Sequence, residues 1–107
     1  MDERFEDVIR RLWFEQQGTA LELADELARL ARHNDPSADA LERGYRAAHR
    51  LAGSLGMYGI PEGSEIASRL EDHLSPGQER ALPRDVVVSL AARLRRLVAD
   101  GPIAPSP

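Results

Sequence analysis

RAAHRLAGSLGMYG, residues 46–59, is the stretch that decides the fold of this chain. With successive residues placed at about 100° around a helix axis, its apolar side chains gather at roughly 200° from His49. Arg46, Gly53 and Gly56 fall within about 60° of the histidine. The stretch therefore predicts an amphipathic helix that buries one face and holds His49 in solvent. The buried face would consist of Ala47, Ala48, Leu51, Leu55 and Tyr58.

Five helices and no strand are predicted along the chain. A first helix, at about 3–16, carries apolar residues at helical spacing, and Gly18 interrupts it. A second, at about 20–33, begins at a capping box formed by Thr19 and Glu22, although both segments could also be one bent helix. Asp35 and the following proline cap a third helix at about 36–58, and prolines open the last two, at about 61–74 and 83–99.

These helices predict an all-α domain. Helices 20–33, 36–58, 61–74 and 83–99 form an antiparallel four-helix bundle, and the additional N-terminal helix 3–16 covers one end or edge. Residues 1–100 form this single bundle domain. Residues 101–107 are rich in proline and are expected to be a disordered tail or a linker. A linker would make this chain the N-terminal module of a larger protein.

Composition removes several classes of function. The chain has no cysteine and no lysine, which excludes thiolate and Schiff-base chemistry. A net charge of −4 with both signs interspersed argues against nucleic-acid binding. No apolar run approaches the length of about 20 residues that spans a bilayer, and the N-terminus does not resemble a signal peptide. We therefore expect a cytoplasmic protein that contacts neither nucleic acid nor membrane.

His49 is the candidate reactive group. A neutral imidazole has a nitrogen lone pair near neutral pH and can accept a phosphoryl group. Arg46 and Arg50 lie within reach and could balance phosphate charge. Glycine inside a helix costs about 1 kcal/mol relative to alanine, so Gly53 and Gly56 on the histidine face suggest clearance for a partner. The alternative interpretation is a surface histidine without a role, flanked by ordinary helix charges and incidental glycines.

The stretch resembles the signature of histidine-containing phosphotransfer (HPt) domains. Ala48-His49, Leu51, Gly53, Ser54 and Gly59 match that signature, and Ala52 stands where the family has lysine. The following helix, through Ile66, Ala67, Leu70 and Glu71, is also similar to the family. The resemblance covers about a quarter of the chain by motif, and nearly all of it by helix order.

The resemblance implies a phosphocarrier of a two-component phosphorelay. His49 would accept a phosphoryl group from a histidine kinase or a receiver-domain aspartate and pass it on. Arg46 or Arg50 would support the phosphate in place of the missing lysine, and Gly53, Gly56 and Ala52 would form the surface that the receiver approaches. No metal or cofactor is expected on this chain, because magnesium would belong to the receiver domain, and no kinase activity of its own is expected. A monomer is expected, since no coiled-coil seam is evident.

Two other classes of function compete with this prediction. The first is a non-catalytic interaction module, a degenerate relative that docks a signalling partner through an apolar patch involving Trp13, Phe14 or Met57. The second is a metal or cofactor enzyme built inside the bundle. His33, His49 and His73 could be its ligands, but none of them completes a Glu-x-x-His motif.

Overall fold

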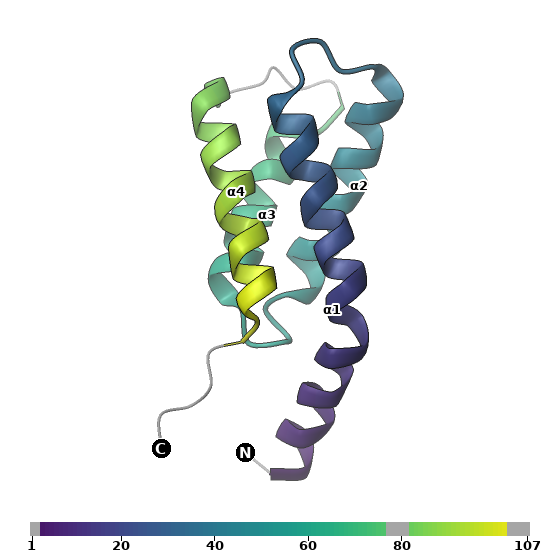
Figure 1. The fold of residues 1–107 in the computed structure, drawn as a ribbon, viewed down its shortest axis with the longest axis vertical. Coiled ribbons are helices and arrows are strands. Elements are labelled where there is room, and N and C mark those ends of the chain that lie inside the picture. Colours follow the sequence, from purple (N-terminus) through teal and green to yellow (C-terminus); the bar gives the residue numbers. More distant parts are fainter. Residues whose placement is uncertain (1–2, 77–81, 103–107) are drawn as a thin grey trace.

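Four helices build the molecule. The computed structural model describes residues 3–76 and 82–102, in which α1 (Glu3–Arg32), α2 (Ala38–Ser54), α3 (Pro61–Leu74) and α4 (Arg84–Asp100) run antiparallel (Figure 1). Helix α1 packs on α2 and α4, and α3 packs on the same two helices, so the four surround one core. The predicted all-α four-helix bundle is confirmed, and the bounds of α3 coincide with the predicted 61–74. No helix in the described part of the chain is long and apolar enough to cross a bilayer.

The two predicted N-terminal helices are one continuous helix. Gly18 lies within α1, exposed, with open space where a side chain would begin. Its cost of about 1 kcal/mol is offset because Trp13 and Ala20, on either side, are both buried on the face that packs against the bundle. Gln17 adds a direct tie, since its Nε2 donates to the carbonyl oxygens of Val98 and Ala99 at 3.0 and 3.1 Å. The prediction of a separate helix 3–16 and a capping box at Thr19 was therefore wrong.

Helix α2 is shorter at both ends than predicted. Ser37 is its N-cap, with Oγ accepting from the backbone N–H of Ala40 at 3.1 Å, so the predicted cap at Asp35 was wrong. At the other end, α2 stops at Ser54 and residues 55–59 form turns. Gly59 has φ +83°, and the Ile60 N–H bonds back to the Leu55 carbonyl at 2.9 Å. This reversal directs Ile60 into the core, where it is 4% exposed.

The predicted buried face of α2 is confirmed. Ala47, Ala48, Leu51, Leu55 and Tyr58 all lie in the core. Gly44, on the same face, permits close contact with α1, because a Cβ there would lie 2.3 Å from Leu30 Cδ2. Trp13 is buried against Tyr58 with ring centroids 5.4 Å apart. The bundle is thus packed through small residues on α2 and one aromatic pair at the end that carries the turn at residues 55–59.

Ion pairs join neighbouring helices at the surface. Arg93 of α4 pairs with Glu62 of α3, and Arg95 of α4 pairs with Asp25 of α1. The hydrogen bond from Arg93 holds the pKa of the Glu62 carboxyl below its ordinary value. Gly101, with φ +78°, caps α4. Of the predicted proline-rich tail 101–107, residues 103–107 lie outside the described residues, and the domain boundary stays a prediction.

Candidate functional site

His49 projects from the middle of α2 into solvent. Its side chain is 68% exposed, whereas its neighbour Ala48 is completely buried. The ring stacks on that of Tyr45, one helical turn earlier, with centroids 6.3 Å apart and an angle of 18° between the planes. The helix and this aromatic neighbour together restrict the orientation of the imidazole without covering it. The predicted position of His49 on the solvent face is therefore the one observed.

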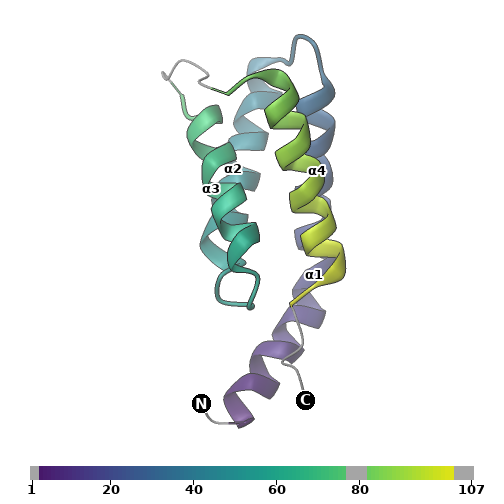
Figure 2. The ribbon, with the colours of Figure 1, turned by 90° about the vertical axis from the view of Figure 1, so that its left-hand side faces the viewer.

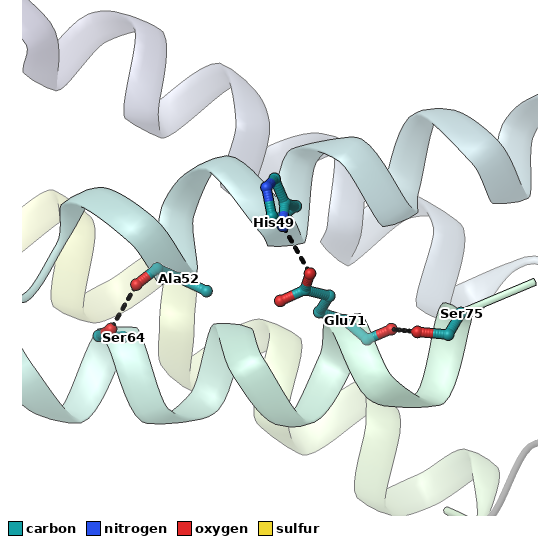
Figure 3. A network of polar contacts seen from close by, with 5 residues as sticks. All are labelled: His49, Ala52, Ser64, Glu71 and Ser75. Carbon is teal, nitrogen blue, oxygen red and sulfur yellow. Dashed lines mark hydrogen bonds and ion pairs between the residues drawn. The ribbon is translucent and has the colours of Figure 1, made fainter.

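Glu71 of α3 fixes one nitrogen of the ring. Its Oε2 lies 2.6 Å from His49 Nδ1, and its side chain is only 21% exposed (Figure 3). An ionised carboxylate can only accept a hydrogen bond, so Nδ1 carries the proton and donates it. In the neutral ring the lone pair then belongs to Nε2. This nitrogen points away from Glu71 and has no hydrogen-bond partner among residues 3–76 and 82–102.

Small and polar residues set the register between α2 and α3 around this pair. Ser64 Oγ of α3 donates to the carbonyl oxygen of Ala52 of α2 at 2.6 Å, which joins the two helices, whereas Ser75 Oγ donates to the carbonyl oxygen of Glu71 at 2.9 Å at the C-terminal end of α3 itself (Figure 3). Gly56 also faces α3, because a Cβ there would lie 3.8 Å from Ser64. The seam between the two helices is therefore close on the α3 side of His49, and the Glu71 carboxylate is held within it.

The side of α2 that faces α1 beyond His49 is open and carries Arg50. A hollow of about 320 Å³ lies between α1 and α2, with Arg50 and Gly53 on its α2 wall and Gln16 and Thr19 on its α1 wall. A Cβ at Gly53 would meet nothing within 4 Å. Arg50 is exposed, and its guanidinium has no hydrogen bond or ion pair within the described part of the chain. This side can therefore admit another molecule without rearrangement of the bundle.

Comparison with protein-family models gives one match, to the Hpt domain, over residues 8–100. The chain belongs to the Hpt domain family. No curated protein and no solved structure matches it. Hpt domains take part in the phosphotransfer of two-component phosphorelays and act there as phosphocarriers, and the match includes α1 from residue 8 onward and the whole of α2, α3 and α4. The family resemblance of residues 48–59 is thereby confirmed for nearly the whole chain.

The structure places the predicted site residues of this Hpt domain differently. Arg50 and Gly53 line the hollow toward α1. His49 and Arg46 are exposed and are not among the residues that line it, and Arg46 Nη2 lies 2.8 Å from Glu42 Oε1. Ala52 and Gly56 lie instead at the seam with α3. Gly56 was predicted to leave room for a partner, but α3 of the same chain already lies close to this position. The roles of all six residues stay predictions.

Sequence analysis missed Glu71 as the partner of His49. The two residues are far apart in the sequence, and no motif links them. A signal exists in the turn between the helices, because His49 and Glu71 are equally distant from Ile60 along the chain, as are Gly56 and Ser64. Two antiparallel helices joined by a tight reversal pair such positions. Recognition of the reversal at Ile60 would have placed a carboxylate opposite the histidine.

Proposed function

We propose that this Hpt domain accepts a phosphoryl group on Nε2 of His49 and transfers it to a second protein. The donor is a receiver-domain aspartyl phosphate or a histidine kinase, and the acceptor is a receiver aspartate. The observation that carries the proposal is the hydrogen bond between His49 Nδ1 and Glu71, which supports the tautomer whose lone pair is on the exposed Nε2. A surface histidine without a role would need no such orienting carboxylate.

The transfer step follows from this geometry. The Nε2 lone pair attacks the phosphorus of the acyl phosphate, an N–P bond forms, and the P–O bond breaks with its electron pair leaving on the aspartate. The proton on Nδ1 stays in place, so the phosphorylated ring is an imidazolium facing the Glu71 carboxylate. Positive charge on the ring also makes the imidazole a good leaving group in the next transfer. Glu71 therefore supports both directions of the exchange.

Arginine would supply the positive charge that lysine supplies in the family. Ala52 has no charge to offer and lies at the seam with α3, so phosphate support would come from Arg50, which lines the hollow toward α1, and from Arg46, which is exposed one turn before it. Phosphoryl transfer depends mainly on positioning and charge neutralisation. The proposal assigns no metal or cofactor to this chain, and places magnesium in the acidic pocket of the receiver domain.

The hollow between α1 and α2 is proposed as the contact for the receiver domain. It begins beside Gly53, one turn beyond His49, and continues along α1 past Gln16 and Thr19. A receiver domain seated there would bring its aspartate over the open side of the imidazole. The decisive experiment is incubation of the purified chain with a phosphorylated receiver domain or a kinase. The chain should acquire acid-labile phosphate, and this phosphate should be absent when His49 is replaced.

Two substitutions of Glu71, by alanine and by glutamine, test its role and can be compared with each other. Glu71→Ala is expected to slow phosphoryl transfer by about 10- to 100-fold, since the loss of a charge-assisted hydrogen bond of about 1.5–3 kcal/mol frees the ring and its tautomer. Glu71→Gln keeps a hydrogen-bond acceptor and should lose less. Rapid-quench measurement of transfer checks both, and ¹⁵N chemical shifts of the ring report the tautomer. Unchanged shifts and rates in Glu71→Ala would remove Glu71 from the mechanism.

The two arginines are expected to differ. Arg50→Ala should slow transfer about 5- to 20-fold, because its guanidinium is uncommitted on the open side, whereas Arg46→Ala should have the smaller effect because Arg46 already pairs with Glu42. Both side chains are exposed, so the melting temperature should change little. Transfer rates and thermal denaturation of the two variants provide the test. A larger loss for Arg46→Ala would reverse the assignment.

The interaction module is the second candidate function. Phe14 is 72% exposed and Met57 is 56% exposed, so two of the three residues proposed for its apolar patch are available to a partner, while Trp13 is buried. The absence of lysine at Ala52 also fits a relative that docks without transferring. A chain that binds its receiver domain but acquires no phosphate from it would establish this function instead.

A further inference from the structure

Tyr45 is the aromatic neighbour of His49 on α2, a helix that lies in the middle of the bundle in both views (Figure 2). The two rings are displaced but nearly parallel, with centroids 6.3 Å apart and 18° between their planes. Side chains on a helix lean toward its N-terminus, so the imidazole leans toward Tyr45. Offset rings at this separation are a favoured arrangement of aromatic side chains. The contact therefore contributes to the conformation of the imidazole.

The packing of the bundle does not account for Tyr45. This residue is half-buried and is not among the residues that form or pack on the hydrophobic core, whereas the other tyrosine, Tyr58, belongs to that core. The Tyr45 hydroxyl has no hydrogen bond within residues 3–76 and 82–102. An aromatic residue that neither fills the core nor uses its hydroxyl is best explained by the ring on which it stacks.

The hydrogen bond to Glu71 does not by itself fix the plane of the imidazole. The torsion between Cβ and the ring of a histidine is broad, and a hydrogen bond tolerates a deviation of about 30° from linearity. With the bond from His49 Nδ1 alone, the ring could still turn within that range. The Nε2 lone pair lies in the ring plane, so the plane decides the direction from which phosphorus can approach. Reacting atoms out of alignment slow the transfer.

The positions one turn before and one turn after His49 differ in size. Tyr45 places a ring on the N-terminal side of the imidazole, whereas Gly53 has no side chain on the C-terminal side, where an added Cβ would meet nothing within 4 Å. Residues four apart share a helix face, so these two positions flank the histidine. The imidazole thus has an aromatic support on one side and open space on the other. A partner that approaches past Gly53 meets a ring that is supported from behind.

We propose that Tyr45 is a positioning residue for phosphoryl transfer at His49, a role that rests on the proposed phosphotransfer function. Tyr45 supports the imidazole and keeps its plane, and with it the Nε2 lone pair, aligned with the phosphorus of the donor. The bonds that form and break are those between His49, the phosphoryl group and the receiver aspartate. Tyr45 touches none of these atoms except through the imidazole. Because the same alignment serves acceptance and donation, its loss slows both directions.

Transfer kinetics at increasing concentrations of a receiver domain that phosphorylates the natural chain test the proposal. Tyr45→Leu should lower the rate at saturation by about 5- to 20-fold, because leucine offers no flat face to the imidazole. The concentration that gives half the maximal rate should stay the same, since Tyr45 does not line the hollow toward α1. Tyr45→Phe is the matched control and should transfer like the natural chain, because it keeps the ring. Thermal denaturation verifies that both variants fold.

Two kinetic outcomes would contradict the role of Tyr45. Transfer in Tyr45→Leu at the rate of the natural chain would show that the imidazole needs no aromatic support. A loss in Tyr45→Phe as large as that in Tyr45→Leu would show that the hydroxyl acts, not the stacked ring.

Nuclear magnetic resonance of the chain without a partner supplies an independent measurement. The carbon-bound protons of the His49 ring sense the aromatic ring beside them, and three-bond couplings report the torsion about Cβ–Cγ. Tyr45→Leu should shift these resonances and broaden the distribution of the torsion, and Tyr45→Phe should preserve both. Ring resonances that do not respond to Tyr45→Leu overturn the stacking itself. If they respond but the natural chain accepts no phosphate, the proposed phosphotransfer function fails and the role of Tyr45 in it fails too.

Discussion

Replacement of His49 by glutamine is expected to remove phosphoryl acceptance completely. Glutamine fits an exposed helix position, so the bundle should fold as before, but its amide nitrogen has no lone pair available for attack on phosphorus. We expect a loss of at least about 1,000-fold in labelling from a phosphorylated receiver domain, consistent with removal of the nucleophile itself. The measurement is phosphate incorporation from a labelled donor, followed by its release in acid.

His33→Gln is the matched control for this experiment. His33 is also exposed, directly after the C-terminal end of α1, where its Nδ1 accepts from the Asp35 backbone N–H at 3.3 Å. The same substitution there should leave labelling at the level of the natural sequence. If phosphate persists in His49→Gln and disappears in His33→Gln, the phosphoryl acceptor is His33 and the proposal for His49 is wrong. Phosphate that persists in both variants would exclude histidine phosphorylation at these two positions.

Substitutions of Gly53 by larger residues are expected to increase the stability of the bundle and to slow phosphoryl transfer. A methyl group at this exposed helix position meets nothing within 4 Å, so Gly53→Ala should raise the free energy of unfolding by about 0.5–1 kcal/mol. Gly53→Leu places a larger side chain at the mouth of the hollow beside His49 and should slow transfer from a receiver domain by about 100-fold. Chemical denaturation and transfer kinetics on the same samples give both quantities.

Gly18 provides the comparison for Gly53. Within residues 3–76 and 82–102 it is the other exposed glycine inside a helix whose added Cβ meets nothing within 4 Å, and it lies on α1 outside the residues that line the hollow. Gly18→Leu should stabilise the helix as Gly53→Leu does and leave transfer unchanged. Equal loss of transfer in both variants would show that the effect comes from a general change in α1 and α2. Full transfer in Gly53→Leu would show that the partner approaches from another side.

Residues whose role is decided within one helix were predictable from the sequence. The buried stripe of α2 and the exposed position of His49 follow from helical periodicity alone, and Pro61 marks the start of α3 because proline fits the first turn. The close approach at Gly44 was also predictable, since a glycine on an apolar face suggests contact with another helix.

The features that were predicted wrongly or missed are those that depend on contacts between helices. Gly18 is a poor helix residue, and α1 continues through it because Trp13 and Ala20 on either side are buried and Gln17 is bonded to α4. Asp35 and Ser37 are both good N-caps by residue type, so the choice between them depends on how the chain leaves α1. Glu71 reaches His49 only through the register of two helices, which periodicity along one helix does not contain.

The reversal at residues 55–60 determines more than the path of the chain. Its length sets which residue of α3 stands opposite His49, because the register of the two helices is counted from Ile60. One residue added there would rotate α3 by about 100° relative to the imidazole, while both helices could still form. Under the proposed role of Glu71, the number of residues in this loop would be constrained by phosphotransfer as well as by the fold. Related chains that vary in length at this position should have lost the carboxylate opposite their histidine, or have moved it by the same number of residues.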